Sequence, residues 1–332
     1  MRSRSRWSLV GLLGLCLVLV AGACGDGDDE SAESTTNSTV VEQAPTFAPG
    51  TTMANVQSKG KLVVGVKFDQ PGFGQKNPTN GQVEGFDVEI AKLIAVGLFG
   101  GTPESVTPKV EFVEAVSKNR EPFIQNGNVD IVIATYTIND TRKQVVDFAG
   151  PYFVAEQDLM VKSDDDAIKS VTDLNGKKVC TVKGSTSETN VRQKAPQADV
   201  TLFDTYSQCA EALGDGRVVA VTTDNTILAG LVQQSNGQYK LVDAPFSNEP
   251  YGIGLKKGDE AFRDFLNNRL EEIEADGSWS QAFAGTLGKL GLETPTPPRI
   301  DRYTSTPAGA TTTAPAGATT TTAAPGATTT TG

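Results

Sequence analysis

The stretch KLVVGV at residues 61–66, followed by VEIAKLIA at residues 88–95, decides the fold class. The first is a short apolar run rich in β-branched residues, which is typical of a buried strand. The second has apolar residues at helical spacing. The alternation continues, with strands expected at 110–113, 129–134, 178–182 and 218–222 and helices at 260–274 and 278–287. Such alternation predicts an α/β fold with mainly parallel sheets.

The composition excludes several classes of function. The chain contains no histidine, so Ser-His-Asp and Cys-His catalysis and His-ligated metal sites are excluded. After residue 23 the chain holds 26 basic and 40 acidic residues, a net charge of −14. This balance argues against a nucleic-acid or anionic-surface partner, because both require a basic face. We expect neither a metal nor a cofactor.

The N-terminus has the pattern of an export signal. Three arginines within the first six residues precede the uncharged run 7–23, which ends in AGAC at residues 21–24. This ending resembles the bacterial lipobox, in which the cysteine is lipidated and becomes the first mature residue. The pattern predicts a signal peptide at 1–23, a lipid on Cys24, and a chain held on the extracytoplasmic face of the cell membrane. The alternative is a transmembrane anchor, although 17 uncharged residues are few for a span of ~20.

Two flanking segments are poor in large apolar side chains. Residues 24–57 are rich in Ser, Thr, Gly and acids, and we expect a disordered, lipidated tether there. Residues 293–332 contain repeats of PAGATTT, which predict a disordered tail rich in Thr, Pro and Ala. Composition leaves open whether this tail is O-glycosylated or unmodified.

Two cysteines remain once Cys16 leaves with the signal peptide and Cys24 carries the lipid. They are Cys180 and Cys209. Two cysteines in an exported domain most simply form one disulfide. The alternative is a pair of buried free thiols.

Five motifs occur in the order found in the polar amino-acid binding proteins of ABC importers, the solute-binding proteins of family 3. They are GFDVEIA at 85–91, ATYTINDTR at 134–142 with VDF at 146–148, GSTS at 184–187, AVTTD at 220–224, and YGIG at 251–254. The resemblance implies a two-lobed periplasmic-binding-protein fold of type II with a hinge between the lobes. Lobe one would comprise residues 58–150 and 251–292, and lobe two the inserted residues 157–245. It further implies a monomer that delivers a small molecule to an ABC permease.

The resemblance also assigns the groups that would hold the backbone of a free amino acid. Arg142 takes the position of the family's arginine, whose fork of donors matches a carboxylate. Thr137 would add donors, and Ser185 and Thr186 open a helix whose N-terminus favours an anion. Asp224 would hold the ammonium group. Without the motifs, an arginine such as Arg142 would more often be a solvated turn residue, and an aspartate such as Asp224 would more often be a helix cap.

The ligand's side chain would be recognised by Lys67 and Arg120. Both match positions where the resemblance places basic residues of the acidic-amino-acid binders, so the chain is most similar to glutamate- and aspartate-binding members. Two further cations facing one pocket suit a second carboxylate, since an unpaired buried charge is costly. Asparagine and glutamine remain open, as does the alternative that both residues are surface cations. Tyr136, with Phe68 and Phe73, is expected to wall the cleft.

Three functions compete on this basis. The first is a lipid-anchored receptor that delivers glutamate or aspartate to an ABC importer. The second is a sensor whose liganded form docks on a membrane signalling protein. The third is an enzyme, because cyclohexadienyl dehydratase-like enzymes use this fold with an added general acid. No motif places an unassigned acid in the cleft, so we predict a binding protein and not an enzyme.

Overall fold

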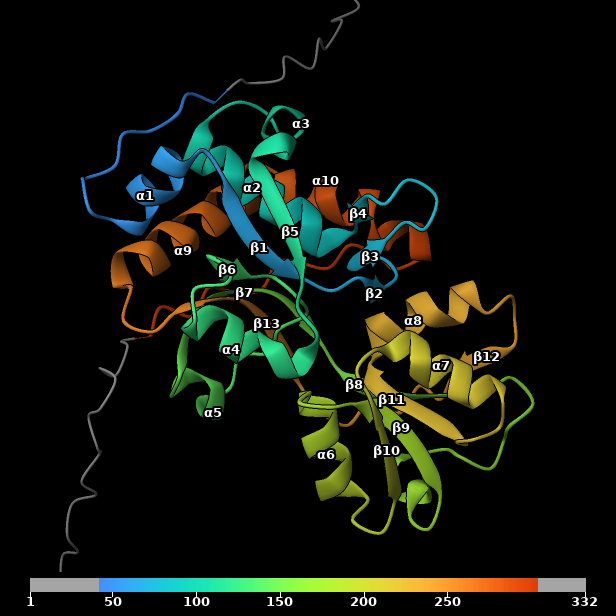
Figure 1. The fold of residues 1–332 in the computed structure, drawn as a ribbon. Helices are drawn as coiled ribbons and strands as arrows, with labels where there is room; N and C mark the ends of the chain where they lie inside the picture. Colours follow the sequence, from blue (N-terminus) through green and yellow to red (C-terminus); the bar gives the residue numbers. More distant parts are fainter. Residues whose placement is uncertain (1–41, 304–332) are drawn as a thin grey trace, which may run out of the picture. The chain divides into compact units, whose positions relative to one another are not determined.

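The computed structural model describes residues 42–303, which form two α/β lobes, each built on its own five-stranded sheet (Figure 1). The sheet of lobe one has the strand order β5-β1-β6-β13-β7, and the sheet of lobe two has the order β10-β9-β11-β8-β12. A small antiparallel sheet, β2-β3-β4, belongs to lobe one. The α/β, two-lobed fold that the sequence predicts is confirmed.

Lobe one is formed by two separate segments of the chain, and 3₁₀ turns occur at Thr107–Lys109, Ser117–Asn119 and Leu287–Leu290. Its first segment contains α1 (Thr52–Lys59), β1 (Leu62–Val66), β2 (Asp69–Gln70), β3 (Gly74–Lys76), β4 (Val83–Glu84), α2 (Phe86–Phe99), α3 (Pro103–Val106), β5 (Val110–Glu114), α4 (Arg120–Gln125), β6 (Ile131–Val132), α5 (Asp140–Lys143) and β7 (Val146–Ala155). Its second segment contains β13 (Glu249–Lys256), α9 (Glu260–Ala275) and α10 (Ser278–Gly285).

Lobe two is one continuous insertion between β7 and β13. It contains β8 (Gln157–Lys162), a 3₁₀ turn at Val171–Leu174, β9 (Lys178–Val182), α6 (Thr186–Lys194), β10 (Asp199–Phe203), α7 (Tyr206–Gly214), β11 (Ala220–Asp224), α8 (Asn225–Gln234) and β12 (Tyr239–Leu241). Strand β9 runs parallel to both β10 and β11, whereas β8 runs antiparallel to β11 and β12. The Cys180–Cys209 disulfide that the sequence predicts is present and joins β9 to α7.

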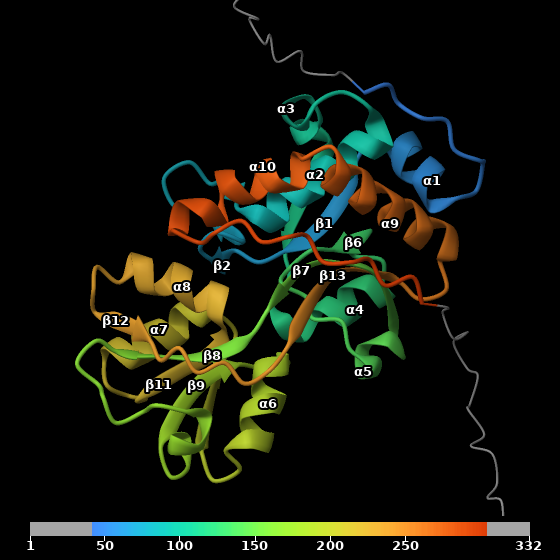
Figure 2. The ribbon, with the colours of Figure 1, turned by 180° about the vertical axis from the view of Figure 1, so that it is seen from behind.

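Helices cover both faces of the lobe-one sheet. Helices α2, α9 and α10 lie on one face and α4 on the other (Figures 1 and 2). Strand β1 lies between β5 and β6 and parallel to both, and its side chains Leu62, Val64 and Val66 are fully buried. Gly85 opens α2 at φ 133°, where a Cβ would lie 2.2 Å from the carbonyl oxygen of Phe73. Only glycine fits this turn, which brings α2 against β3.

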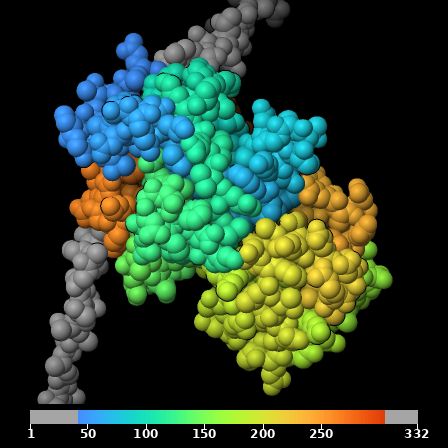
Figure 3. Space-filling view, viewed as in Figure 1, coloured from blue at the N-terminus to red at the C-terminus, as the bar shows by residue number. Residues whose placement is uncertain are grey.

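Two segments of the chain connect the lobes, and they pair with each other where they leave lobe one. Strand β13 is antiparallel to β7, with Glu249 opposite Ala155. Just beyond this pair, the amide of Phe246 donates to the carbonyl of Gln157 at 3.0 Å. The two lobes also meet on the face shown in Figure 3. An ion pair joins them as well, because the Lys118 ammonium lies 2.6 Å from the Asp204 carboxylate.

Parts of the expected tether and of the expected tail contact lobe one. Helix α1 (Thr52–Lys59) begins within the expected tether, and Phe47 makes an edge contact with Phe265 of α9 at 5.4 Å between ring centroids. Within the expected tail, the Arg302 guanidinium lies 2.8 Å from Glu271, and the Tyr303 hydroxyl accepts the amide of Phe148 at 2.8 Å. The structure therefore contradicts disorder within 42–57 and 293–303, because an aromatic contact at Phe47 and polar contacts at Arg302 and Tyr303 join these segments to α9 and β7.

Several sequence predictions lie outside the described residues. These are the signal peptide, the lipid-bearing Cys24 and the PAGATTT repeats. Among residues 42–303, no helix combines the length and apolar character that a membrane crossing requires.

Candidate ligand site between the lobes

The predicted ligand residues of the two lobes lie next to one another where the lobes meet. The Oγ atoms of Thr137 in lobe one and Thr186 in lobe two are 3.4 Å apart. The Arg142 guanidinium donates to the carbonyl of Gly184 at 3.3 Å across the same junction. Gly184 has φ +76°, and a Cβ there would lie 2.9 Å from the Cα of Lys118. The GSTS turn therefore approaches lobe one as closely as backbone atoms permit.

Arg142 is held in a fixed orientation from three sides. Asn139 caps the short helix α5 by accepting the amide of Arg142 at 2.9 Å. The Arg142 side chain then pairs through Nε with Glu121 at 3.1 Å and donates through Nη1 to the carbonyl of Thr137 at 2.7 Å. Its side chain is 7% exposed, so it is no solvated turn residue. A guanidinium fixed in this way is prepared to bind a carboxylate.

Arg120 and Tyr136 form a stacked group with Arg142. The guanidinium carbons of Arg120 and Arg142 lie 4.4 and 4.8 Å from the centroid of the Tyr136 ring. Arg120 is buried and donates through Nη1 to the carbonyl oxygens of Ala134 and Thr135. Burial and, secondarily, the charge of Arg142 lower the pKa of Arg120 to about 10, so it remains a cation at neutral pH. Arg120 is therefore no surface cation.

Lys67 is also buried, at the end of β1. Its side chain is 1% exposed and its Nζ lies 3.3 Å from Oδ1 of Asp69. Neither of these two atoms has a hydrogen-bond partner within residues 42–303. Burial lowers the pKa of Lys67, and the Asp69 carboxylate opposes this shift. A buried ammonium without a hydrogen bond indicates a place for an acceptor that comes from outside the chain.

In lobe two the start of α6 is prepared for an anion. Ser185 occupies the N-cap: its hydroxyl accepts the amide of Glu188 at 3.1 Å and donates to the carbonyl of Val182 at 2.7 Å. Thr186 is the first residue of the helix and faces Thr137. The positive end of the helix therefore points to the junction of the lobes.

Asp224 lies at the N-cap of α8 but does not cap it. Its Oδ2 accepts the hydroxyl of Tyr251, whereas its buried Oδ1 has no hydrogen-bond partner within residues 42–303. Burial and, secondarily, the charge of Glu249 raise the pKa of Asp224 to about 7. A desolvated carboxylate with one free oxygen is suited to accept an ammonium group.

Sequence reasoning missed three acidic residues that organise this site. Glu121 orients Arg142, and Asp69 faces Lys67. Glu249, 2% exposed, accepts the hydroxyl of Thr137 at 2.8 Å and the side-chain amide of Asn190 from lobe two at 2.8 Å. Asp69 follows Lys67 by two residues, and Glu249 precedes the YGIG motif at 251–254 by two residues. The available signal was therefore an acid close to a buried run.

The expected aromatic wall is only partly present. Tyr136 lies beside both arginines, as described above. Phe73 belongs instead to the core, where its ring contacts Phe86, Phe153 and Tyr251. The turn at Gly72 and Gly85 directs Phe73 toward α2, and this local geometry was not visible in the sequence.

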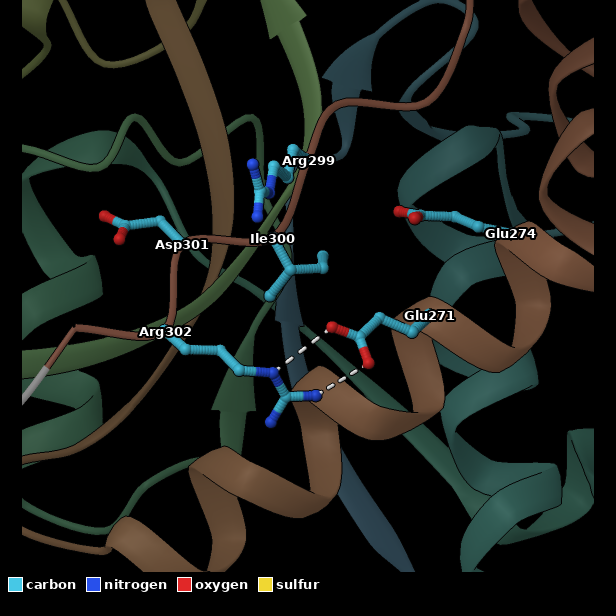
Figure 4. Close-up of a pocket in the computed structure, with 6 residues that line it drawn as sticks. All are labelled: Glu271, Glu274, Arg299, Ile300, Asp301 and Arg302. Atoms are coloured by element: carbon cyan, nitrogen blue, oxygen red, sulfur yellow. Dashed lines mark hydrogen bonds and ion pairs between the residues drawn. The ribbon is translucent and has the colours of Figure 1, made fainter.

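A separate pocket of about 650 Å³ lies on lobe one, between α9 and residues 299–302 (Figure 4). It is lined by Glu271, Glu274, Arg299, Ile300, Asp301 and Arg302, and Arg302 is paired with Glu271. None of the predicted ligand residues lines this pocket. Among the described residues, no group of carboxylates and thiols could hold a metal ion.

The fold and the site together define a class of protein. Two α/β lobes are joined by paired strands, and buried polar groups of opposite charge face their junction, which is the design of a two-lobed solute-binding protein. The chain belongs to family 3 of the bacterial extracellular solute-binding proteins, whose model matches residues 62–288. It is a binding protein and not an enzyme.

Named relatives agree with this assignment. The ABC transporter glutamine-binding protein GlnH of Bacillus subtilis (strain 168) is 40% identical over 83% of this chain and 94% of its own length. The glutamate-binding protein GluB of Corynebacterium glutamicum is 42% identical over 69% of this chain and 79% of its own length. Among solved structures, an ancestral arginine-binding protein bound to glutamine has a TM-score of 0.63 at 40% identity, covering 69% of this chain and 98% of that one.

Proposed function

We propose that this protein binds an acidic amino acid, glutamate or aspartate, outside the cytoplasm and delivers it to an ABC importer. One observation carries the proposal: Lys67 Nζ in lobe one and Asp224 Oδ1 in lobe two are buried without a hydrogen-bond partner within residues 42–303. A free amino acid would supply both hydrogen bonds: a carboxylate for the lysine, which otherwise has only the ion pair with Asp69, and an ammonium group for the aspartate. The names of GlnH and GluB support an amino-acid ligand and an ABC transporter as partner.

The charges of lobe one favour an acidic side chain over an amide. Arg142 is available for the α-carboxylate, which leaves Arg120 and Lys67 for the remainder of the ligand. Both are buried, and neither Lys67 Nζ nor the face of Arg120 over Tyr136 is exposed to bulk solvent. Asp69 already faces Lys67, but Arg120 donates only to neutral carbonyl groups within residues 42–303. A second carboxylate would compensate the charge of Arg120, whereas an amide would not.

The test is the ratio of glutamate affinity to glutamine affinity. Lys67→Met and Arg120→Met remove charge and keep an apolar stem of similar length. We expect each to reduce the ratio about 10- to 150-fold, since one hydrogen bond to a charged group contributes ~1.5–3 kcal/mol. Calorimetric titration measures both affinities after bound ligand has been removed by unfolding and refolding.

Lys61→Met is the matched control, because the Lys61 side chain is 50% exposed at the other end of the same strand. It should leave the ratio unchanged. If Lys67→Met and Arg120→Met also leave it unchanged, acidic specificity is wrong, although amino-acid binding would stand.

We further propose that Cys24 carries the lipid that anchors the protein, on the basis of the AGAC motif. Cys24→Ala should release the protein from the membrane, because stable attachment requires more than one acyl chain and none would be added. Fractionation of cells that express the wild type and the variant measures this. A variant that stays with the membrane after its signal has been removed would contradict the proposal.

A further inference from the structure

Asp69 contacts both the specificity lysine and the opposite lobe. Its side chain is 7% exposed, and its Oδ1 lies 3.3 Å from Lys67 Nζ. Its Oδ2 accepts the backbone amide of Tyr206 at 2.6 Å. Lys67 and Asp69 belong to lobe one, whereas Tyr206 is the first residue of α7 in lobe two. One carboxylate thus connects Lys67, the residue proposed to recognise the ligand's side chain, to helix α7 of lobe two.

The amide that Asp69 accepts is an end group of a helix. The N-cap of α7 is Thr205, whose hydroxyl accepts the amide of Gln208, so the cap satisfies a different amide of the first turn. The amide of Tyr206 has no acceptor within its own helix, because the first amides of a helix precede the hydrogen-bond ladder. An anion at this position is also favoured by the helix dipole. The contact is therefore a charge-assisted hydrogen bond at a helix N-terminus.

Tyr206 in turn contacts the rest of the site. Lys67 Nζ lies 5.9 Å from the centroid of its ring. Its hydroxyl lies 3.4 Å from Oγ of Ser187 on α6, and that oxygen lies 3.2 Å from Oγ1 of Thr223, the neighbour of Asp224. Both members of the Lys67–Asp69 pair thus contact one residue of lobe two that adjoins the anion-binding helix and the ammonium-binding acid.

Helix α7 is fixed to the body of lobe two. The Cys180–Cys209 disulfide joins it to β9, and both cysteines are fully buried. The N-terminus of α7 therefore moves together with the sheet of lobe two. A contact that fixes this end of the helix fixes the position of the whole lobe.

We propose that Asp69 is a positioning residue with two effects, a latch that holds the lobes together and a specificity determinant that partly neutralises Lys67. This rests on the proposed function only in its second effect. A ligand carboxylate that binds Lys67 must compete with Asp69 for it, so the aspartate reduces the preference for acidic ligands. The same carboxylate stabilises the closed lobes for every ligand, because only the closed form brings Tyr206 to it.

Hydrogen–deuterium exchange at Tyr206 tests the latch in the full chain, purified in detergent and free of amino acids. We expect Asp69→Ala to exchange this amide about tenfold faster or more than the wild type, because the acceptor and the closing contact are both lost. Lys118→Ala removes another contact between the lobes, the pair with Asp204, whose side chains are 38% and 49% exposed. Exposed pairs contribute little, so this variant should exchange as the wild type does.

Titration with glutamate and glutamine tests the specificity effect. Asp69→Asn retains an acceptor for Tyr206 but removes the negative charge, so it should raise the ratio of glutamate to glutamine affinity about tenfold. Asp69→Ala should raise the ratio too, and should weaken both ligands together. A thermal unfolding curve for each variant confirms that it folds.

The outcomes separate the two proposals. Unchanged exchange at Tyr206 in Asp69→Ala would overturn the latch, and an unchanged affinity ratio in Asp69→Asn would overturn the specificity effect. If the wild type binds neither glutamate nor glutamine, the proposed function fails, and the exchange experiment still decides the latch.

Discussion

Arg142→Ala should weaken the binding of every amino acid about 100-fold or more, because every such ligand carries an α-carboxylate. A guanidinium donates two parallel hydrogen bonds to a carboxylate. Losing two bonds of ~1.5–3 kcal/mol each corresponds to about two decades of affinity or more. Calorimetric titration of the variant with glutamate, glutamine, aspartate and asparagine measures the loss. The ratios among these ligands should stay as in the wild type, in contrast to those of the Lys67 and Arg120 variants.

Two further variants separate lost recognition from damage to the site. Arg142→Ala leaves Glu121 without its partner, so the double variant with Glu121→Gln should bind as weakly as the single one. Arg192→Ala is the matched control, because the Arg192 side chain is 51% exposed on α6 and should not affect affinity. Recovery of binding in the double variant would show that Glu121, and not the ligand, accounts for the loss.

The parts of the fold that depend on local pattern were predictable. The β-branched run at 61–66 forms β1, and the apolar periodicity at 88–95 lies within α2 (Phe86–Phe99). The helix expected at 260–274 spans Glu260–Ala275. Each of these elements buries its own apolar residues, so a short window of sequence is enough to predict whether it is a helix or a strand.

The parts that depend on distant partners were not predictable. Phe47 is an isolated aromatic residue in a polar segment, and its ring contacts Phe265 of α9, which lies more than 200 residues later in the chain. Asp69 reads as a surface acid after a strand, and its partner amide at Tyr206 is 137 residues away. The motifs placed Arg142 and Asp224 at the junction of the lobes. They did not reveal Glu121, which pairs with Arg142, or Glu249, whose charge contributes to the raised pKa of Asp224, because neither acid belongs to a periodic pattern.

Asp224 should make affinity depend on pH near neutrality. Burial raises its pKa to about 7 in the ligand-free protein, and only the ionised carboxylate pairs with the ligand's ammonium group. Below pH 7, binding must first remove a proton, so affinity should fall about tenfold for each pH unit as the pH decreases. Titration at pH 8, 7 and 6 in two buffers of different ionisation enthalpy measures both the decrease and the proton release. Asp224→Asn should weaken binding about 100-fold or more and abolish the proton release.

The same raised pKa determines how the stability of the ligand-free protein changes with pH. A carboxyl group whose folded pKa is above its unfolded value binds its proton more tightly in the folded state, so it lowers the free energy of unfolding as the pH rises from about 4 to about 7. Asp224→Asn removes this loss and retains an acceptor for the Tyr251 hydroxyl. Without ligand, the variant should therefore unfold like the wild type near pH 4 and at a higher temperature than the wild type at pH 8. A variant that is equally destabilised at both pH values would show that Asp224 carries no burial cost. In that case the ligand's ammonium group would have no such cost to offset. The expected result would instead mean that the ammonium group compensates the unfavourable burial of the Asp224 charge when the ligand binds.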